Sequence, residues 1–382
     1  MRRTTSFGGA EIAILDLLKA IDYETNIVLL ASSGDVFSTL LTDLKLPVTS
    51  LPLTARFTGG FVRMFISWIR YLNRLRPDAI ILAEGGFRDF PLCTALAAFV
   101  IARGNLWMME FHPAPQPTTK HSRTRFTFIP RLSPLKRPRA WLTKGILSAS
   151  QGVKDRLVNG YGYAPEKIRV VYTGVDTKRF SPVSQDSRKG LRRQLQIPDE
   201  AVVVVSAARL HRIKRLDRLI QAFSALSLEY KDLWLLLTGD GPLRDELKRL
   251  AQSVNNREHI RFLGHVKDVC AILRASDIYV LPSDEEGFGI ALAEAMACEL
   301  VCVATKTVGP SEIIEDGLNG FLTDLTYDGV LKGLDQALRL GHKERRAIGE
   351  RARQTVVDNF RVEETTAKSL AFMEINPAGA VR

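Results

Sequence analysis

The sequence predicts an α/β protein with two doubly wound domains, each built on a parallel sheet that is covered by helices. Three observations support this fold class. Short apolar runs alternate with helical patterns through nearly all of the 382 residues, which is typical of parallel sheets. There are ten such runs, and one open twisted sheet rarely holds more. Glycine-containing turns follow several of the runs, as expected at the carboxyl ends of strands.

The first half is expected to form the first sheet. Its apolar runs predict strands at Asn26–Leu30, Ala79–Leu82, Leu106–Phe111, Gly145–Leu147 and Ile168–Tyr172. Helical spacing between them predicts helices at Gly9–Ala20, Phe61–Leu75, Pro91–Ile101 and Gly152–Asn159. Gly8 and Gly9 look like the strand-to-helix turn of a first unit, but Met1–Phe7 contains no apolar run. We therefore expect the first strand to be absent, through a misplaced start or a truncation.

The second half repeats this pattern. Its predicted strands are Val202–Ala207, Leu233–Leu237, Ile260–Leu263, Ile278–Leu281 and Val301–Ala304. Its predicted helices are Arg215–Ser227, Leu243–Val254, Val269–Ala275, Ile290–Cys298 and Gly329–Arg339. The polar stretch Phe180–Pro198 is the expected link, which gives domains at 1–180 and 181–360. A last helix at Glu363–Met373, within 361–382, is expected to pack back towards the first domain.

Charge is unevenly distributed along the chain. From Met1 to Pro182 there are 25 Lys and Arg against 13 Asp and Glu, whereas the remainder has 28 against 29. The segment Phe111–Lys154 contains no acid and mixes basic with aromatic side chains. It favours an anionic partner such as a membrane surface, a lipid diphosphate or nucleic acid. A solvated basic loop is the alternative.

The sequence predicts neither a spanning helix nor a structural metal. The longest apolar run, Pro91–Ala102, is shorter than the roughly 20 residues that cross a bilayer. The N-terminus lacks the pattern of a signal peptide. The four cysteines form no CxxC pair and, with histidine, no zinc spacing, so a reducing, cytoplasmic location is expected.

Two cations follow the first strand of the second domain. Arg209 and Lys214 lie in the predicted loop after Val202–Ala207. Two cations beside a helix N-terminus suit a diphosphate, although a basic surface turn is the alternative. Gly239 and Gly241 follow the next strand, but no third glycine completes a dinucleotide fingerprint. This argues against a dehydrogenase.

The stretch Ser283–Ala297 combines acids, glycines and an apolar helix. Gly287 and Gly289 allow the backbone to approach a ligand, and amides at a helix N-terminus favour phosphate. Glu286 lies on the loop, and Glu294 lies in the helix without a cation at helical spacing. Because a buried carboxylate needs partners, we interpret both acids as acceptors for hydroxyl groups of a sugar nucleotide.

Two further residues are candidates for the same site. Glu312 follows the strand Val301–Ala304, although a helix capped by Ser311 is the alternative explanation of this segment. His112 ends the strand Leu106–Phe111, where a histidine can orient a sugar. A structural role is the alternative for this histidine.

These segments together resemble the retaining glycosyltransferases of family 4, which have the GT-B fold. The resemblance covers nearly the whole chain and is strongest over Ala164–Thr323. It rests on EKIRVVYTGVDTKRFSP, ARLHRIKRLDRLIQAF, TGDGPLRDELKRLA, IRFLGHV, ASDIYVLPSDEEGFGIALAEAMA and VGPSEIIEDGLNGFL, in the family's order. The acids of Glu286-x7-Glu294 are similar to the family's signature.

The resemblance implies a role for each candidate residue. Arg209 and Lys214 would hold the donor diphosphate, Glu286 would contact the transferred sugar, and Glu294 would contact the ribose. The remaining site residues implied are Phe288, Gly289 and Ile290 beside phosphate and sugar, Gly239 in the donor site, Val266 beside the base, His112 beside the sugar, and Gly8 and Gly9 over the donor. No metal is expected, because cations and helix dipoles carry the phosphate charge.

The chain departs from the family pattern at a few positions. Glycine is usual where this chain has Ala208, Arg215 and Glu299. Proline is usual at Val301, and asparagine at Thr173. None of these changes removes a charged group assigned to the site.

We therefore expect a retaining hexosyltransferase that takes a UDP-sugar or GDP-sugar donor, needs no cofactor, and modifies a glycan or lipid-linked acceptor. It would act in polysaccharide or glycoconjugate biosynthesis, in the cytoplasm, with an anionic membrane surface as a candidate partner. One alternative is an inactive family member that binds sugar nucleotide as a scaffold. A nucleic-acid-binding protein is disfavoured, because the aromatic residues form no recognisable RNA-binding motif. The donor base, the sugar and the acceptor stay open.

Overall fold

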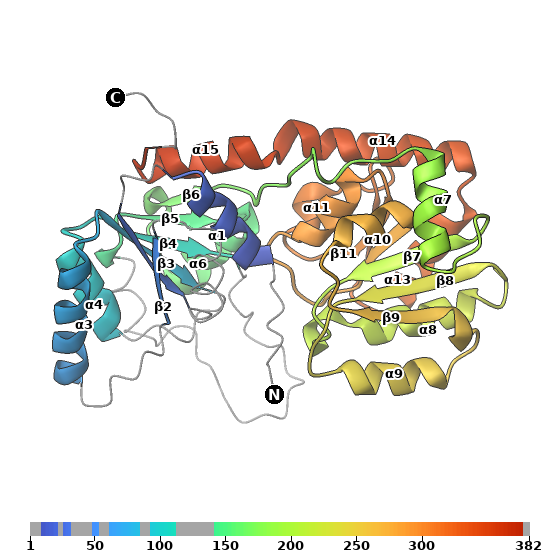
Figure 1. Cartoon of the computed structure of the whole chain (residues 1–382), viewed down its shortest axis with the longest axis horizontal. Helices are drawn as coiled ribbons and strands as arrows, with labels where there is room; N and C mark the ends of the chain where they lie inside the picture. The colour runs from blue at the N-terminus through green and yellow to red at the C-terminus, as the bar shows by residue number, and fades with distance from the viewer. Residues whose placement is uncertain are drawn as a thin grey trace. The chain divides into compact units, whose positions relative to one another are not determined.

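The computed structural model describes residues 9–21, 26–31, 48–52, 61–84, 92–111 and 141–376. Contacts between residues divide the chain into two compact units. The N-terminal unit contains Ala10–Tyr172 and the chain from Glu364 onward, and the C-terminal unit contains Thr173–Glu363. Each unit holds a parallel sheet with helices packed on it (Figure 1), which confirms the predicted fold class.

In the N-terminal unit, the described strands form one sheet in the order β2-β1-β3-β4-β5-β6. These strands are β1 (Ile27–Ala31), β2 (Val48–Pro52), β3 (Ala79–Glu84), β4 (Leu106–Glu110), β5 (Gly145–Ser148) and β6 (Ile168–Val170). The described helices include α1 (Gly9–Lys19), α3 (Phe61–Leu75), α4 (Leu92–Ile101) and α6 (Gln151–Tyr161). β1 pairs directly with β3, and Ile27 lies opposite Ala79. The expectation of a missing first strand concerns Met1–Phe7, which lie outside the described residues.

The C-terminal unit contains a second parallel sheet, in the order β12-β11-β10-β7-β8-β9. Its strands are β7 (Val202–Ala207), β8 (Leu233–Thr238), β9 (Ile260–Gly264), β10 (Ile278–Leu281), β11 (Val301–Thr305) and β12 (Phe321–Thr323). Its helices are α7 (Gln185–Gln194), α8 (Leu216–Leu226), α9 (Arg244–Gln252), α10 (Val269–Ala275), α11 (Ile290–Ala297), α12 (Pro310–Ile313), α13 (Tyr327–Arg339) and α14 (His342–Asn359). α8 and α13 pack together on one face of the sheet, and α11 and α14 pack together on the other (Figure 1).

The core of the C-terminal unit explains why its strands appear as continuous apolar runs. Strand residues such as Val204, Leu235 and Val280 are buried, and Phe223 of α8 and Leu334 of α13 pack over them. Because helices cover both faces of the sheet, strand residues that point to either face are apolar. Burial of each such large side chain contributes roughly 1.5–3 kcal/mol.

The helix α7 is attached to its sheet by charged side chains. Arg192 is 3% exposed. Its guanidinium donates to the carboxylate of Asp277 at 2.7 Å and to the carbonyl oxygens of Ala201 and Ala275 at 2.9 and 3.0 Å. Arg188, one turn earlier in α7, pairs with the same Asp277. The first helix of the C-terminal unit is therefore fixed to the amino ends of its central strands.

Several elements were absent from the sequence prediction. The strands β2 and β12 are short and lie at sheet edges, where a pattern of a few residues is weak. The helix α7 has Leu191 as its one large apolar side chain. The helix α14 buries Ile348, Ala352 and Val356 in an otherwise polar sequence. Periodicity alone does not reveal helices of this kind.

The chain passes from the C-terminal unit to the N-terminal unit within α15 (Val362–Phe372). The Phe372 ring packs edge-on against the indole of Trp107 in β4, with 5.4 Å between the ring centroids. Lys144 pairs with Glu374 at 2.6 Å. The end of α15 is thus anchored on the sheet of the N-terminal unit.

Some predictions fall on residues that are not described. Gly8, His112 and most of the basic segment, residues 112–140, belong to this group. In the part of the chain that is described, no helix has both the length and the apolar character needed to cross a membrane.

Two residues with side chains adopt left-handed backbone angles where the resemblance leads us to expect glycine. Arg215 has a φ of 48° and Glu299 a φ of 65°. Such a conformation costs roughly 1–2 kcal/mol for a residue that carries a Cβ atom. Arg215 makes ion pairs with Asp217 and Asp284, which offset this cost. At Glu299, burial instead raises the pKa of the carboxyl group.

The substitution Arg192→Ala is expected to lower the free energy of unfolding by about 3 kcal/mol, because it leaves buried carbonyl oxygens and Asp277 with fewer partners. The neighbouring exposed Arg193 provides a matched control, and Arg193→Ala should change this free energy by less than about 0.5 kcal/mol. Calorimetric unfolding of both variants tests the prediction. Equal effects of the two substitutions would contradict the anchoring role.

The substitution Glu299→Gly is expected to raise the free energy of unfolding by about 1 kcal/mol, because glycine adopts this backbone conformation without strain. The pKa of the Glu299 carboxyl group is raised in the folded protein, so its ionised form destabilises the fold at neutral pH. Below the pKa that this group has in the unfolded chain, it is protonated in both states and this destabilisation disappears. The gain should therefore shrink as the solution becomes acidic. Glu299→Ala removes the charge but keeps the Cβ atom, so a gain as large as that of glycine would refute the strain argument in the same calorimetric assay.

Candidate functional site

The candidate site lies at the carboxyl ends of β7 and β10. These strands pair in parallel, with Tyr279 opposite Val205, and the order of the sheet reverses between them. Ligands of doubly wound sheets bind where the order reverses, because the loops after the two strands diverge there. We call residues 208–215 the β7 loop and residues 282–289 the β10 loop. The predicted cations lie on the first and the predicted acid Glu286 on the second.

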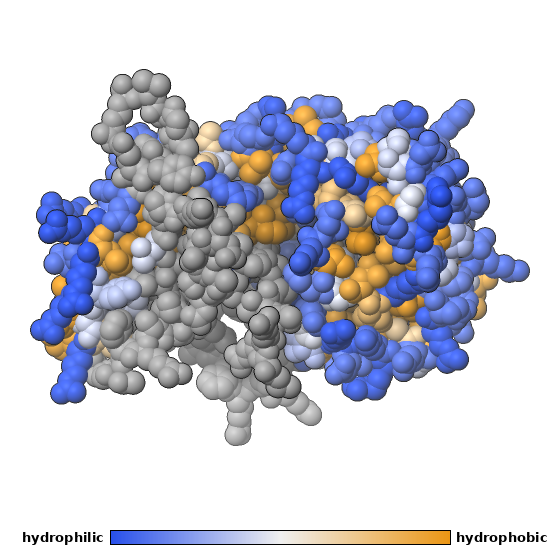
Figure 2. Space-filling model, viewed as in Figure 1, coloured by the Kyte–Doolittle hydropathy of each residue, from blue (hydrophilic) through white to orange (hydrophobic). Residues whose placement is uncertain are grey.

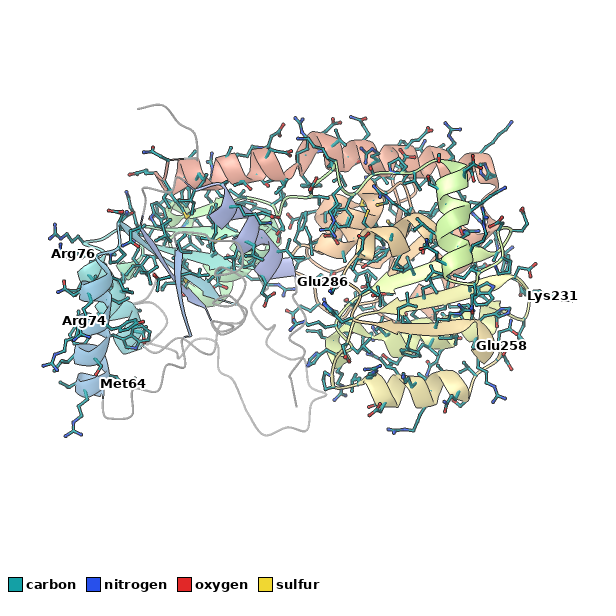
Figure 3. The ribbon with its side chains drawn as sticks, viewed as in Figure 1. Met64, Arg74, Arg76, Lys231, Glu258 and Glu286 are labelled. Atoms are coloured by element: carbon teal, nitrogen blue, oxygen red, sulfur yellow. The ribbon has the colours of Figure 1, made fainter. Side chains whose placement is uncertain are left out.

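An ion pair joins the two loops. The Nζ atom of Lys214 lies 2.5 Å from Oε1 of Glu286, and Figure 3 labels this glutamate at one side of the C-terminal unit. The hydroxyl of Ser283 donates to the same oxygen at 2.9 Å. The side chains of Lys214 and Glu286 are 16% and 11% exposed, so the pair is largely shielded from water. Two residues 72 positions apart in the chain are thus brought into contact.

A second set of contacts holds the same loops together. The carboxylate of Asp284 accepts from Arg215 at 3.2 Å and from Arg218 at 2.5 Å. Its backbone amide donates to the carbonyl oxygen of Ile213 at 2.8 Å. Side chains and backbone therefore fix the β10 loop against the β7 loop before any ligand is considered.

The helix α11 carries the second predicted acid. Gly289 is its N-cap, and Glu294 is 8% exposed. Tyr279 of β10 is fully buried, and its hydroxyl donates to the carbonyl oxygen of Ala207 at 3.3 Å. Burial, followed by the nearby carboxylates of Glu286 and Glu294, raises the pKa of Tyr279 well above its ordinary value. Both acids therefore lie near one buried tyrosine, which stays neutral and keeps its proton.

The loop after β11 approaches the β10 loop closely. The amide of Gly309 donates to the carbonyl oxygen of Glu286 at 3.2 Å. A Cβ atom at Gly309 would lie 2.2 Å from the carbonyl oxygen of Phe288. The Phe288 ring packs edge-on against Phe360, with 5.3 Å between the centroids. The backbone that was predicted to face phosphate is thus supported from behind by a glycine and a buried ring.

Backbone packing explains why position 239 is a glycine. Its φ is 125°, and a Cβ atom there would lie 2.0 Å from the carbonyl oxygen of Ala208 in the β7 loop. Its amide donates to the carbonyl oxygen of Gly264 at 2.7 Å, two residues before Val266. The roles of Gly239 and Val266 in donor binding stay predictions, because packing alone accounts for this glycine.

Arg209 is exposed, and its guanidinium makes no hydrogen bond or ion pair with another residue that the structure describes. Glu312 lies in α12, which begins at Pro310 with Gly309 as its N-cap. The alternative of a helix in this segment is therefore confirmed, but its cap is Gly309, because Ser311 is the second residue of the helix. Gly9 is the first residue of α1, and the N-terminal unit begins at the next residue, Ala10.

Two family models match complementary parts of the chain. The family described as Glycosyltransferase Family 4 matches residues 7–179. The family described as Glycosyl transferases group 1 matches residues 187–355 and so includes the β7 and β10 loops. The chain belongs to the family 4-like glycosyltransferases. The resemblance to family 4 glycosyltransferases is confirmed, whereas retention of configuration and the Glu286-x7-Glu294 signature stay predictions.

Curated relatives match the chain over part of their length. It is 32% identical over 204 residues to the N-acetyl-alpha-D-glucosaminyl L-malate synthase of Bacillus anthracis, a match that covers 53% of the chain and 52% of the relative. It is 31% identical over 236 residues to the lipopolysaccharide core biosynthesis glycosyltransferase LpsE of Rhizobium meliloti, covering 62% of the chain and 65% of the relative. Each match thus spans between about half and two thirds of the relative.

Solved structures show the same fold over nearly the full chain. HepE of Anabaena, solved in complex with UDP and glucose, has a TM-score of 0.77 at 22% identity, with 98% of both chains covered. A glycosyltransferase of Rickettsia africae has a TM-score of 0.70 at 16% identity, covering 92% of this chain and 98% of that one. These similarities confirm the GT-B fold of this chain.

Four residues that shape the candidate site were not predicted. They are Arg218, Tyr279, Ser283 and Asp284. Ser283 and Asp284 stand directly after a buried strand, which is a usable signal. Arg218 lies one helical turn after Arg215, so its nearness to the β7 loop is also readable. The sequence alone does not show that Asp284 is the acid with which both Arg215 and Arg218 form ion pairs.

The substitution Gly309→Ala is expected to lower the free energy of unfolding by about 1–3 kcal/mol, because the added methyl group overlaps the backbone of Phe288. Gly190 in α7 is the matched control, since a Cβ atom there meets nothing within 4 Å. Gly190→Ala should leave stability unchanged or raise it by up to about 1 kcal/mol. Urea unfolding measures both variants, and a neutral Gly309→Ala would contradict the close approach of these loops.

Proposed function

We propose that the chain transfers a hexose from a nucleoside diphosphate sugar to a glycan or lipid-linked acceptor, with retention of the anomeric configuration. The observation that carries this proposal is the meeting of Lys214 and Glu286 at the point where the order of the C-terminal sheet reverses. A cation for phosphate and a carboxylate for sugar hydroxyls are both needed by such a donor. The family membership of both halves of the chain supports it.

The diphosphate is assigned to the β7 loop and the start of α11. A lysine ammonium has three N–H donors, so Lys214 can keep Glu286 and still bond a phosphate oxygen. Arg209 is exposed at the same loop and offers a planar pair of donors. The backbone amides of Phe288, Gly289 and Ile290 add the partial positive charge of a helix N-terminus. These groups neutralise the diphosphate in a proposal that requires no metal ion.

The two carboxylates are assigned to opposite ends of the donor. Glu286 lies on the loop and would accept hydrogen bonds from hydroxyl groups of the sugar. Glu294 lies in the second turn of α11 and would accept hydrogen bonds from hydroxyl groups of the ribose. Carboxylates that accept charge-assisted hydrogen bonds contribute roughly 1.5–3 kcal/mol each.

The transfer step can be written with all bonds balanced. An acceptor hydroxyl oxygen bonds to the anomeric carbon while the bond from that carbon to the diphosphate oxygen breaks. The hydroxyl proton passes to the leaving phosphate oxygen, and attack from the same face retains the configuration. The cations stabilise the charge that grows on the leaving diphosphate. They stabilise the transition state more than the ground state, and this difference lowers the barrier to transfer.

UDP is the first nucleotide to test, because HepE of Anabaena, which shares this fold, was solved with UDP and with UDP-glucose. A cytoplasmic location belongs to the same proposal. It is supported by Cys270, Cys298 and Cys302, which are buried free thiols, as is usual for proteins of a reducing compartment.

Calorimetric titration of UDP and of GDP into the full chain tests the proposal. One nucleotide should bind, and Glu294→Gln should weaken its affinity by about 10–100-fold, which corresponds to the loss of a hydrogen bond to a charged group. Glu286→Gln should leave nucleotide affinity within about threefold, because its role concerns the sugar, and should lower turnover of the matching UDP- or GDP-sugar by about 10–100-fold.

Glu258 is the matched control, an exposed acid at the opposite side of the same unit (Figure 3). Glu258→Gln should change neither quantity. Absence of binding by the folded wild-type chain, or equal effects of Glu258→Gln and Glu294→Gln, would contradict the proposal. Binding without any sugar transfer would instead favour an inactive scaffold that binds sugar nucleotide.

A further inference from the structure

The N-terminal unit exposes large apolar side chains on two adjoining helices. Among the described residues, nine large hydrophobic side chains are exposed, and five of them lie on α3 and α4. These five are Val62, Ile66, Tyr71, Phe99 and Val100. The two helices pack against each other, and we call their exposed side, with Val62 and Ile66 of α3, the α3–α4 surface.

The helix α3 separates its buried and exposed residues cleanly. Trp68 and Leu72 are 2% and 0% exposed and attach the helix to the unit, whereas Val62 is 66% exposed and Ile66 is 42% exposed. Residues spaced by three or four positions lie on the same side of a helix. Val62, Ile66 and Ile69 therefore form an apolar stripe that faces away from the core.

A basic stripe runs beside the apolar one. Arg63, Arg70 and Arg74 are exposed. Arg63 directly follows Val62, Arg70 directly follows Ile69, and Arg74 lies one turn after Arg70. Arg76 is also exposed just after the helix. Figure 3 labels Arg74 and Arg76 at this end of the unit, and Figure 2 shows blue and orange residues side by side over the helix that Figure 1 labels α3.

No acid balances these arginines within the two helices. The sequence from Phe61 to Pro77 contains four arginines and no Asp or Glu, and Leu92–Asn105 adds Arg103 and again no acid. Large apolar side chains next to unpaired arginines do not suit a surface that only faces water. They suit a partner that is apolar inside and negatively charged at its own surface.

We propose that the α3–α4 surface binds an anionic phospholipid bilayer. The apolar stripe of α3 would enter the boundary between headgroups and acyl chains, as amphipathic interfacial helices do. The arginines of the second stripe would bond lipid phosphates, while their methylene stems stay on the apolar side. This inference does not depend on the transfer reaction.

A second copy of the chain is a poorer occupant of this surface. Two such surfaces brought together would place the arginines of both copies in one interface without an acid from either helix. Like charges brought together at an interface cost several kcal/mol. A bilayer with anionic headgroups supplies the opposite charge over the whole surface.

The test is flotation of the full chain with lipid vesicles, which needs no substrate. Vesicles of phosphatidylcholine mixed with phosphatidylglycerol should carry the protein upward, and vesicles of phosphatidylcholine alone should not. Added salt should weaken the binding, because it screens exposed charges. Failure to bind the mixed vesicles at low salt would overturn the proposal.

Two variants assign the binding to this surface. Replacing Arg63, Arg70 and Arg74 with glutamine should reduce the partition coefficient by about fivefold for each charge, so about a hundredfold in total. V62S/I66S should reduce it by about tenfold by removing apolar area from the interface. All five side chains are exposed, and calorimetric unfolding should show transitions like those of the wild type.

The matched control removes three exposed positive charges from the C-terminal unit. Lys231, Arg249 and Arg257 are exposed there, and the triple glutamine variant should lose less than about threefold in partitioning. Equal losses in both triple variants would mean a general effect of net charge and would overturn the proposal. It would also fail if the α3 variants bound vesicles as the wild type does, or if they abolished a dimer rather than vesicle binding.

Discussion

The parallel pairing of β7 with β10 is the constraint on which the candidate site depends. These strands are 70 or more residues apart in the chain, yet Val204 and Ile278 lie in register. The sheet order reverses between them. The loops that follow the two strands therefore diverge, and a ligand can bind between these loops. The contacts of Lys214 with Glu286, and of Asp284 with its two arginines, form only because this pairing places the two loop starts together. Apolar burial in the strands therefore determines where the polar chemistry lies.

Much of this arrangement could be predicted from the chain itself. The strands Val202–Ala207 and Ile278–Leu281 and the helices Phe61–Leu75 and Val269–Ala275 have the bounds that periodicity predicts. Lys214 and Glu286 could be placed in one site, because carboxyl ends of parallel strands share one edge of a sheet. The helices α7 and α14 could not be predicted, since Arg192 fixes the first by charge and a narrow stripe of small side chains fixes the second. Contributions from His112 and Gly8 stay predictions.

The positions that depart from the family pattern have different physical outcomes. At Arg215 the side chain that replaces the usual glycine makes ion pairs with Asp217 and Asp284, so it takes part in holding the β10 loop. At Glu299 the left-handed backbone is retained, and burial disfavours the charge of its side chain. The sequence could show both departures but not this difference, because the partners of each residue come from distant segments.

The close backbone crossings at Gly239 and Gly309 have a consequence for attempts to change donor choice. Both positions are closed to any side chain, because a carbonyl oxygen of another loop occupies the place of a Cβ atom. A combinatorial library that randomised these two glycines would therefore lose stability in most of its clones. Diversity is better placed at Val266, which is partly exposed and is predicted to lie beside the base. The crossings then act as fixed points, and the recognition chemistry can be varied around them without loss of the scaffold.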